Sequence, residues 1–325
     1  MKKVNLEELA LIAGVSKTTV SLILNGRAEQ YRISPATRDR VLALAEAHQF
    51  TPDASAATLR SGRDRAIGVV IPDYRHFAAM SLLDALDPLA RANGDQLLIS
   101  CSDGDPAQEL TALRQLLSRR VSALVVISVQ HSPTALEFLP CGDVPLVVVG
   151  RSWPDSELRQ LAIGATTAIN TLISALLARR RPKQLLLLNG PADHPDAELR
   201  AQALAGALAP AGIPHHLAHC PERASSAAAA LDLACEELGT IPEVVMASSV
   251  AQLEGALAFL TYHRNRWPPA LTLACTEHHP LLPHLSLPCI SLQPDWQQGG
   301  QSLLALLRQP AGSSAQLKVK LHSAG

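Results

Sequence analysis

The chain has 325 residues, 47% of them hydrophobic, which is enough material for two or three compact domains with large cores. Its few aromatic residues, 3% of the total, exclude the stacking platforms with which many proteins hold single-stranded nucleic acid. The formal net charge is only −1, but residues 1–65 carry ten Lys or Arg against seven Asp or Glu, so a modest basic surplus lies at the N-terminus.

The sequence shows no sign of export or of a membrane segment. No stretch approaches about 18 uninterrupted apolar residues, and the polar residues Asn5, Glu7 and Glu8 interrupt the place where a secretory signal has its apolar core. The six cysteines have neither CxxC pairs nor the dense spacing of a disulfide framework. We therefore expect a cytoplasmic protein with reduced thiols.

The first predicted element is a short helix. Asn5 and Glu8 have the spacing of a capping box, which starts the helix near Leu6. Gly14 ends it in the tight turn that helix-turn-helix units often use.

A second helix follows, capped by Ser16. Its apolar face consists of Val20, Ile23 and Leu24. Its outward face consists of Lys17, Thr18, Ser21 and Leu22. Side chains on the first turns of such a helix can reach base edges in the major groove, Lys17 at a guanine and Thr18 at a thymine methyl or a base edge. Phosphate contacts are expected from Ser16, Thr19 and Asn25.

A third helix is predicted after Ser34 as N-cap, with Pro35 at its first position. Its inward residues are Val41, Leu44 and Ala45. Three short helices can form a small core, which favours a DNA-binding unit over a pair of amphipathic helices that merely has a polar outer face.

Residues 54–61 are predicted to form a weak Ala- and Ser-rich helix between Asp53 as cap and Gly62 as stop. The single large apolar residue, Leu59, has no apolar stripe to join. It either contacts the domain that follows or acts as an apolar wedge between base steps in the minor groove.

From Ala66 onward, apolar runs alternate with helix-period segments. Strands are predicted at 67–71, 96–100, 123–127 and 145–149, with helices around 79–92, 106–119 and 132–139. A second set of strands is predicted at 184–188, 244–246, 271–274 and 289–292, again separated by helices. Two successive sets of βα units indicate two doubly wound lobes rather than one large sheet.

Ligands of such sheets bind outside the carboxyl ends of the strands. The polar residues at those positions are Asp73, Tyr74, Ser102, Ser128, Arg151, Asn189, Ser249 and Thr276. If the lobes face each other, these residues line one cleft.

The run from Leu9 to Gly26, LALIAGVSKTTVSLILNG, together with Thr51-Pro52-Asp53 and Leu59-Arg60, resembles the headpiece and hinge of the lactose repressor family. Within that family, residues 28–34 and 96–103 are similar to the branch of the fructose and sucrose repressors. The resemblance implies that Lys17, Thr18 and Leu22 read bases and that Leu59 intercalates. It further implies a homodimer or tetramer on double-stranded, near-palindromic operator DNA.

The predicted fold is an all-α helix-turn-helix headpiece with a hinge helix, followed by a two-lobed α/β sensor domain like the periplasmic binding proteins. The headpiece covers residues 1–50, the hinge helix and linker 51–65, and the effector-binding and dimerisation domain 66–325. The N-lobe is expected at about 66–160 plus 294–310, and the C-lobe at about 161–292 plus 311–325.

By the same resemblance, Arg200, Arg151 and Gln293 occupy effector-binding positions. Gly150 and the turn Cys275-Thr276-Glu277 depart from the family pattern, so we expect two carboxylate contacts to sugar hydroxyls to be missing. Two arginines with fewer acids favour an anionic sugar phosphate such as a fructose phosphate, although a changed ligand fits the departures equally well.

No other pattern predicts chemistry. The groups His215, His216, His219, Cys220 and Cys275, His278, His279 lack the paired spacing of a zinc site, and Asp103-Gly104-Asp105 does not continue as a calcium loop. No phosphate loop or nucleophile elbow is present in the sequence, so we expect no metal, cofactor or catalytic residues. The competing interpretations are a sugar-binding transport protein and a sugar-processing enzyme of the same two-lobed fold.

Overall fold

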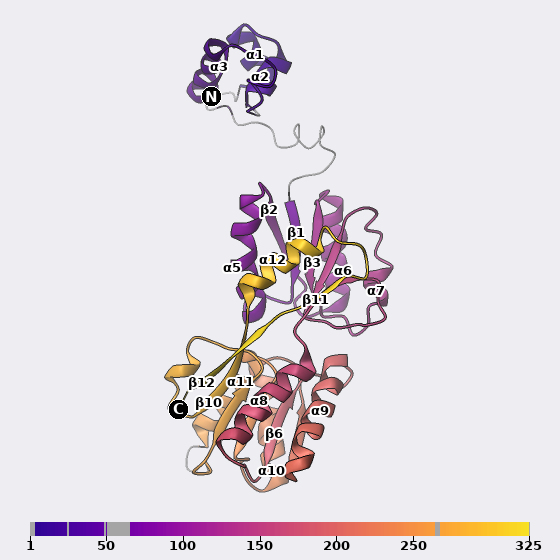
Figure 1. Cartoon of the computed structure of the whole chain (residues 1–325), viewed down its shortest axis with the longest axis vertical. Helices are drawn as coiled ribbons and strands as arrows, with labels where there is room; N and C mark the ends of the chain where they lie inside the picture. Colours follow the sequence, from indigo (N-terminus) through magenta and orange to yellow (C-terminus); the bar gives the residue numbers. More distant parts are fainter. Residues whose placement is uncertain (1–3, 25, 49, 51–65, 264–266, 325) are drawn as a thin grey trace. The chain divides into compact units, whose positions relative to one another are not determined.

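The computed structural model describes residues 4–24, 26–48, 50, 66–263 and 267–324 of the chain (Figure 1). Contacts divide the chain into two compact units, Met1–Asp64 and Arg65–Gly325. These units correspond to the predicted headpiece with its hinge and to the predicted sensor domain.

The headpiece contains the three predicted helices, α1 (Leu6–Ala13), α2 (Lys17–Leu24) and α3 (Pro35–Ala47). The capping box is complete, because the backbone N–H of Glu8 donates to Asn5 Oδ1 at 2.9 Å and that of Asn5 donates to Glu8 Oε2 at 3.0 Å. Gly14 ends α1 in the left-handed region at φ 65°. The buried residues of the small core are Leu9, Ala10, Ala13, Val20, Ile23, Ala28, Val41 and Ala45.

The first lobe of the sensor domain, the N-lobe, has a six-stranded sheet in the order β11-β5-β4-β3-β1-β2, parallel throughout. Its strands are β1 (Ala66–Ile71), β2 (Gln96–Cys101), β3 (Ala123–Ile127), β4 (Leu146–Val149), β5 (Arg159–Ala162) and β11 (Ser314–Gln316). One face packs on α5 (Phe77–Ala92) and α12 (Trp296–Leu306), the other on α6 (Pro106–Ser118) and α7 (Thr134–Glu137). Both faces are therefore covered, as a parallel sheet requires.

The second lobe, the C-lobe, repeats this plan in the order β12-β10-β9-β8-β6-β7, in which only β12 runs antiparallel to its neighbour. Its strands are β6 (Leu185–Asn189), β7 (His215–His219), β8 (Val244–Ala247), β9 (Thr272–Cys275), β10 (Cys289–Pro294) and β12 (Val319–Ala324). One face packs on α8 (Ala165–Arg179) and α9 (Pro195–Leu208), the other on α10 (Ala224–Leu238) and α11 (Val250–Tyr262).

The chain passes between the lobes three times, after β5, after β10 and after β11 (Figure 1). Two predicted boundaries need correction. Residues 161–162 belong to β5, and Ser314–Gln316 pairs with β5 in the N-lobe although it was assigned to the C-lobe. This three-residue strand carries no apolar run that would have marked it in the sequence.

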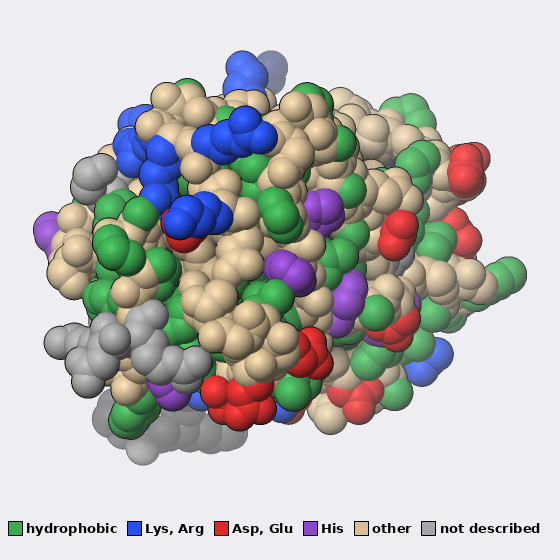
Figure 2. Space-filling model, turned by 90° about the horizontal axis from the view of Figure 1, so that it is seen from below, with side chains coloured by type: hydrophobic (Ala, Val, Ile, Leu, Met, Phe, Trp, Pro, Cys, Tyr) green, Lys and Arg blue, Asp and Glu red, His purple; other side chains and the backbone are tan. Residues whose placement is uncertain are grey.

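None of the helices in the described part of the chain combines the length and the apolar character that crossing a bilayer demands. In the view of Figure 2, most Lys and Arg side chains lie towards the upper left, and Asp and Glu side chains lie along the right and lower sides. This face therefore lacks the uniform basic field that binding to a phosphate backbone needs.

Helices α10 and α11 approach each other closely at Gly255, where an added Cβ would lie 2.1 Å from the carbonyl oxygen of Ala224. Because a backbone carbonyl cannot move aside cheaply, we expect Gly255→Ala to lower the free energy of unfolding by about 3 kcal/mol, at the upper end of overpacking effects. Gly206 in α9 has no neighbour within 4 Å of such a Cβ. Gly206→Ala, the matched control, should raise the stability by up to about 1 kcal/mol. Urea unfolding measures the free energy of unfolding of both variants. Equal changes for Gly255→Ala and Gly206→Ala would contradict the close approach of the two helices.

Candidate functional site

The first candidate site is the outer face of α2. Ser16, Lys17 and Thr18 are exposed, while Thr19 and Leu22 are half-buried. Ser16 caps the helix as predicted, accepting the N–H of Thr19 at 3.1 Å. The ammonium of Lys17 lies 2.5 Å from Glu7 Oε1 on α1, and this pairing lowers the pKa of the Glu7 carboxyl. Both partners are solvent-exposed, so a DNA base or phosphate can replace Glu7 readily.

One expectation for this face is wrong and two lie outside the described residues. Ser21, expected to point outward, is only 5% exposed. Each residue of an α-helix is rotated by about 100° from the one before it, so Ser21 borders the apolar face that contains Val20. Its small side chain fits the core there. Asn25 and Leu59 are not among the described residues, so their phosphate and wedge roles stay predictions.

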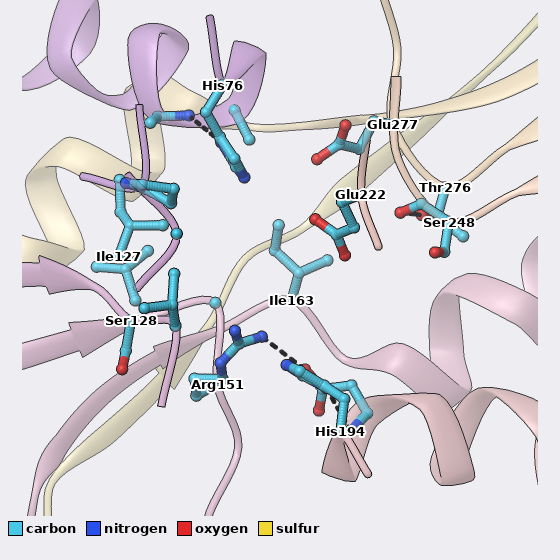
Figure 3. A pocket seen from close by; sticks show the side chains of 18 of the residues that line it. His76, Ile127, Ser128, Arg151, Ile163, His194, Glu222, Ser248, Thr276 and Glu277 are labelled. Carbon is cyan, nitrogen blue, oxygen red and sulfur yellow. Dashed lines mark hydrogen bonds and ion pairs between the residues drawn. The ribbon is translucent and has the colours of Figure 1, made fainter. Parts of the chain in front are cut away.

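The second candidate site is a cavity of about 470 Å³ between the two lobes of the sensor domain (Figure 3). Its walls are the loops that follow the carboxyl ends of strands in both sheets. Of the residues predicted to bind the effector, those that line it are Asp73, Ser128, Arg151, Arg200 and Thr276.

The other four predicted residues do not line the cavity, each for a visible reason. Tyr74 is 64% exposed, and Gln293 lies exposed on β10. Ser102 is fully buried and turns its hydroxyl to the carbonyl of Ile71. Ser249 caps α11 by accepting the N–H of Gln252 at 3.3 Å, and its neighbour Ser248 lines the cavity instead.

The expected shortage of carboxylates is also wrong. The acidic residues that line the cavity are Asp73, Asp103, Asp196, Glu222 and Glu277. The lining arginines are Arg151, Arg200 and Arg223. Sequence reasoning missed His76, His194 and Trp296 as well. Glu222 follows β7, a strand that was not predicted, and His194 precedes a helix rather than following a strand directly.

Arg200 on α9 is held in place by buried amides. It is 9% exposed, and its Nε donates to Asn189 Oδ1 at 2.8 Å, while Asn189 Nδ2 donates to the carbonyl of Ala197 at 2.9 Å. Gln252, fully buried on α11, donates to the carbonyl of Asn189 at 3.0 Å and accepts from Ser248. These bonds fix the loops after β6 and β8 with respect to the arginine.

On the N-lobe side, a buried carboxylate supports the loop after β3. Glu109 on α6 is fully buried and accepts the hydroxyl of Ser128 at 2.9 Å and the N–H of Val129 at 2.6 Å. Loss of solvation raises the pKa of this carboxyl, and the hydrogen bonds and the charge of Arg151 oppose that effect. Glu109 thus orients Ser128 without lining the cavity itself.

Four contacts between described residues cross the cleft. The first is an ion pair, in which Arg151 Nη1 of the N-lobe lies 3.8 Å from Asp196 Oδ2 of the C-lobe. The second joins His131 Nδ1 to Asp193 Oδ2 at 2.9 Å, and it carries charge on both partners only when His131 is protonated. The third is a ring contact between Phe77 and His279, with centroids 4.8 Å apart. The fourth is a tilted ring contact between His131 and His194, with centroids 6.3 Å apart.

The imidazole of His194 is strongly perturbed by its surroundings in the cavity. His194 is 8% exposed and lies near Arg151 and Arg200. Loss of solvation, followed by repulsion from these two cations, lowers the pKa of its imidazole to about 3. The ring is therefore neutral at physiological pH.

The two groups of histidines and cysteines at residues 215–220 and 275–279 do not form a cluster that could bind a metal. No cluster of three or more His, Cys, Asp or Glu side chains that could hold a metal ion occurs among the residues described by the structure. His278 donates to or accepts from Ser291 Oγ at 2.9 Å and stacks on His322, with ring centroids 4.1 Å apart.

Comparison with known proteins gives matches over both units. Residues 5–53 match the model of bacterial regulatory proteins of the lacI family, and residues 64–267 match that of periplasmic binding proteins and the sugar binding domain of the LacI family. The sucrose operon repressor of Klebsiella pneumoniae is 32% identical over 311 residues, which cover 95% of this chain and 92% of that protein.

Two solved structures show the same fold. One is the Lac repressor dimer bound to operator and the anti-inducer ONPF, with a TM-score of 0.80 and 21% identity over 98% of each chain. The other is the Cra transcriptional dual regulator from Pseudomonas putida in complex with fructose 1-phosphate, with a TM-score of 0.70 and 21% identity over 79% of this chain and 98% of that one. The two-lobed fold predicted from the sequence is thereby confirmed.

The lowered pKa of His194 predicts a pH dependence of stability. As the pH falls below about 6.5, the unfolded chain binds a proton at this imidazole whereas the folded chain does not until about pH 3, so stability is lost on acidification. Between pH 7 and pH 5 this loss amounts to about 2 kcal/mol. His194→Asn keeps an N-cap for α9 but cannot titrate. Urea unfolding at both pH values should therefore show a loss about 2 kcal/mol smaller for the variant. Parallel pH profiles would show that His194 titrates normally in the folded chain.

Proposed function

The chain belongs to the lacI family of bacterial regulatory proteins, and from that premise we propose that it is a repressor of carbohydrate-metabolism genes whose operator affinity responds to a sugar or sugar phosphate. It acts as a homodimer or tetramer, and each headpiece reads one half of a near-palindromic operator in the cytoplasm. The observation that carries this proposal is a charged cavity between two lobes on a chain whose separate N-terminal unit is a helix-turn-helix.

The effector class follows from the cavity and from the relatives. Carboxylates accept hydrogen bonds from vicinal hydroxyls and arginines donate to hydroxyl or phosphoryl oxygens, and both types line the cavity. The matched sensor model is a sugar binding domain, and one structural relative holds fructose 1-phosphate. Fructose phosphates, fructose and sucrose are therefore the first ligands to test.

Regulation acts through the relative arrangement of the lobes. Residues on both sides of the cleft touch the cavity, so an effector that binds them together favours a closed arrangement. A coupling of about 1–3 kcal/mol changes operator occupancy several-fold or more. The hinge, with Leu59, lies outside the described residues and stays the predicted link to the headpiece.

We also propose that the chain acts by binding rather than by turnover. Its N-terminal unit matches a family of regulatory proteins, and its relatives include the sucrose operon repressor of Klebsiella pneumoniae. A turnover screen on sugars and sugar phosphates tests this: an activity that is present in wild type and lost in Arg200→Ala would revive the enzyme interpretation.

The effector prediction is tested by thermal unfolding in the presence of fructose, sucrose and fructose 1-phosphate. A ligand that binds only the folded protein stabilises it by about 2.7 kcal/mol at 100 times its Kd. We expect at least one of these ligands to raise the unfolding temperature of wild type and none to do so with Arg200→Ala. An active ligand should also change operator affinity; a ligand that binds without changing it would contradict the regulatory coupling.

The DNA-reading prediction concerns Lys17. We expect Lys17→Ala to lose about 1–3 kcal/mol of discrimination at one base pair of each half-site, because one side chain then no longer donates to a base edge. The assay is binding to a library of single-base operator variants. Glu7→Gln, which removes the partner of Lys17 but leaves its ammonium, is the control and should keep the discrimination. A uniform loss over all sequences would make Lys17 a phosphate contact.

A further inference from the structure

His194 is the N-cap residue of α9 and lies at the C-lobe side of the cavity. Its Nδ1 accepts the backbone N–H of Asp196 at 3.1 Å. In a neutral ring that accepts at Nδ1, the proton sits on Nε2, which is therefore a hydrogen-bond donor. Within the described part of the chain, no residue offers this buried Nε2 a partner.

A second buried donor of the cavity also lacks a hydrogen-bond partner among the described residues. This donor is the Nε of Arg151, which follows β4 in the N-lobe. Its guanidinium reaches Asp196 only through Nη1, at 3.8 Å. The ring of His194 points towards Arg151 in the cavity (Figure 3). We call this pair of donors, Arg151 Nε and His194 Nε2, the donor notch.

A donor notch has a defined chemical preference. Buried N–H groups without acceptors are costly, so both groups gain from an oxygen that accepts from them. The His194 ring stays neutral near neutral pH, because burial disfavours its protonated form and the charges of Arg151, Arg200 and His131 add to that effect. A group that must itself donate, such as an ammonium, has no acceptor in the notch.

We propose that His194 is a specificity-determining residue of the effector site, which donates together with Arg151 to one acceptor oxygen of the effector. This inference rests on the proposed function. The acceptor is a phosphoryl oxygen or a sugar oxygen, and the hydroxyls of the effector then face the carboxylates of Glu222 and Glu277. Since Arg151 and His194 belong to different lobes, one oxygen in the notch contacts both walls of the cleft.

The test uses calorimetric titration of the full chain with fructose 1-phosphate, fructose and inorganic phosphate. His194→Asn retains a helix cap, but its short side chain does not extend to the position of Nε2. His194→Gln places an amide donor closer to that position, and His284→Asn changes an exposed histidine outside the cavity. We expect His194→Asn to weaken the binding of the probe that wild type binds, His194→Gln to restore part of it, and His284→Asn to leave it unchanged.

The size of the loss identifies the oxygen. If the lost hydrogen bond was accepted by a neutral oxygen, the affinity of the probe falls about threefold to tenfold. If it was accepted by an anionic phosphoryl oxygen, the affinity falls about tenfold to a hundredfold. A large loss for fructose 1-phosphate and inorganic phosphate, with a small one for fructose, places the phosphoryl group in the notch. Equal, small losses for fructose and fructose 1-phosphate place a sugar oxygen there.

A second measurement does not depend on tight binding. In ¹⁵N-histidine spectra of the full chain, the signals lost in His194→Asn identify His194, and we expect them to show an Nε2–H tautomer from pH 5 to 8 and to shift with at least one probe. An unchanged affinity in His194→Asn, a titration near pH 6.5, or signals that no probe moves would each overturn the proposal. Failure of the proposed function has a different signature, because ligands would then shift the His194 signals without any change in operator affinity.

Discussion

The cavity depends on one buried cation. Arg200 sits in the C-lobe with 9% of its surface exposed, where a guanidinium is tolerated only if its donors are matched. Asn189 supplies the acceptor, and Gln252 in turn holds the backbone of Asn189 and the loop after β8. Removing any one of these amides leaves a buried polar group without its partner. Side-chain hydrogen bonds therefore tie the loops around Arg200 to the helices and strands that carry them, which is what a preorganised binding wall requires.

Apolar periodicity was enough to locate the interior of the fold. The buried strands β1, β3 and β4 are continuous apolar runs, and the capping signals of α1 and α3 mark their first residues. The strands that sequence reasoning missed are short or lie at sheet edges. β7 reads HHLAH and is only partly buried, while β11 has three residues. Edge positions do not require apolar side chains on both faces, so neither composition nor period distinguishes such segments from loops.

The sequence predicted those residues of the site whose place follows from the order and direction of the strands. Loops after parallel strands converge at one edge, and this placed Asp73, Ser128 and Arg151 correctly at the cavity. The rule does not tell which side chain of a loop turns inward, and Ser248 rather than Ser249 does so because the latter caps a helix. The carboxylates were underestimated for a related reason. Glu222 belongs to the loop after a missed strand, and no local pattern distinguishes it from a solvated acid.

The charge arrangement also bears on how a small molecule can move the lobes. A ligand that binds the open and closed arrangements equally well shifts nothing, however tightly it binds. The effector must therefore make contacts that exist only when both walls are close. Arg151 Nη1 already lies 3.8 Å from Asp196 Oδ2 across the cleft. This distance is longer than that of a hydrogen bond, so the ion pair is loose. An oxygen that accepts from Arg151 on one wall and from a C-lobe donor on the other replaces this loose contact with two hydrogen bonds. At about 0.5–1.5 kcal/mol for a bond from a neutral donor and about 1.5–3 kcal/mol for one from the charged guanidinium, two such bonds are enough to supply the coupling that regulation needs.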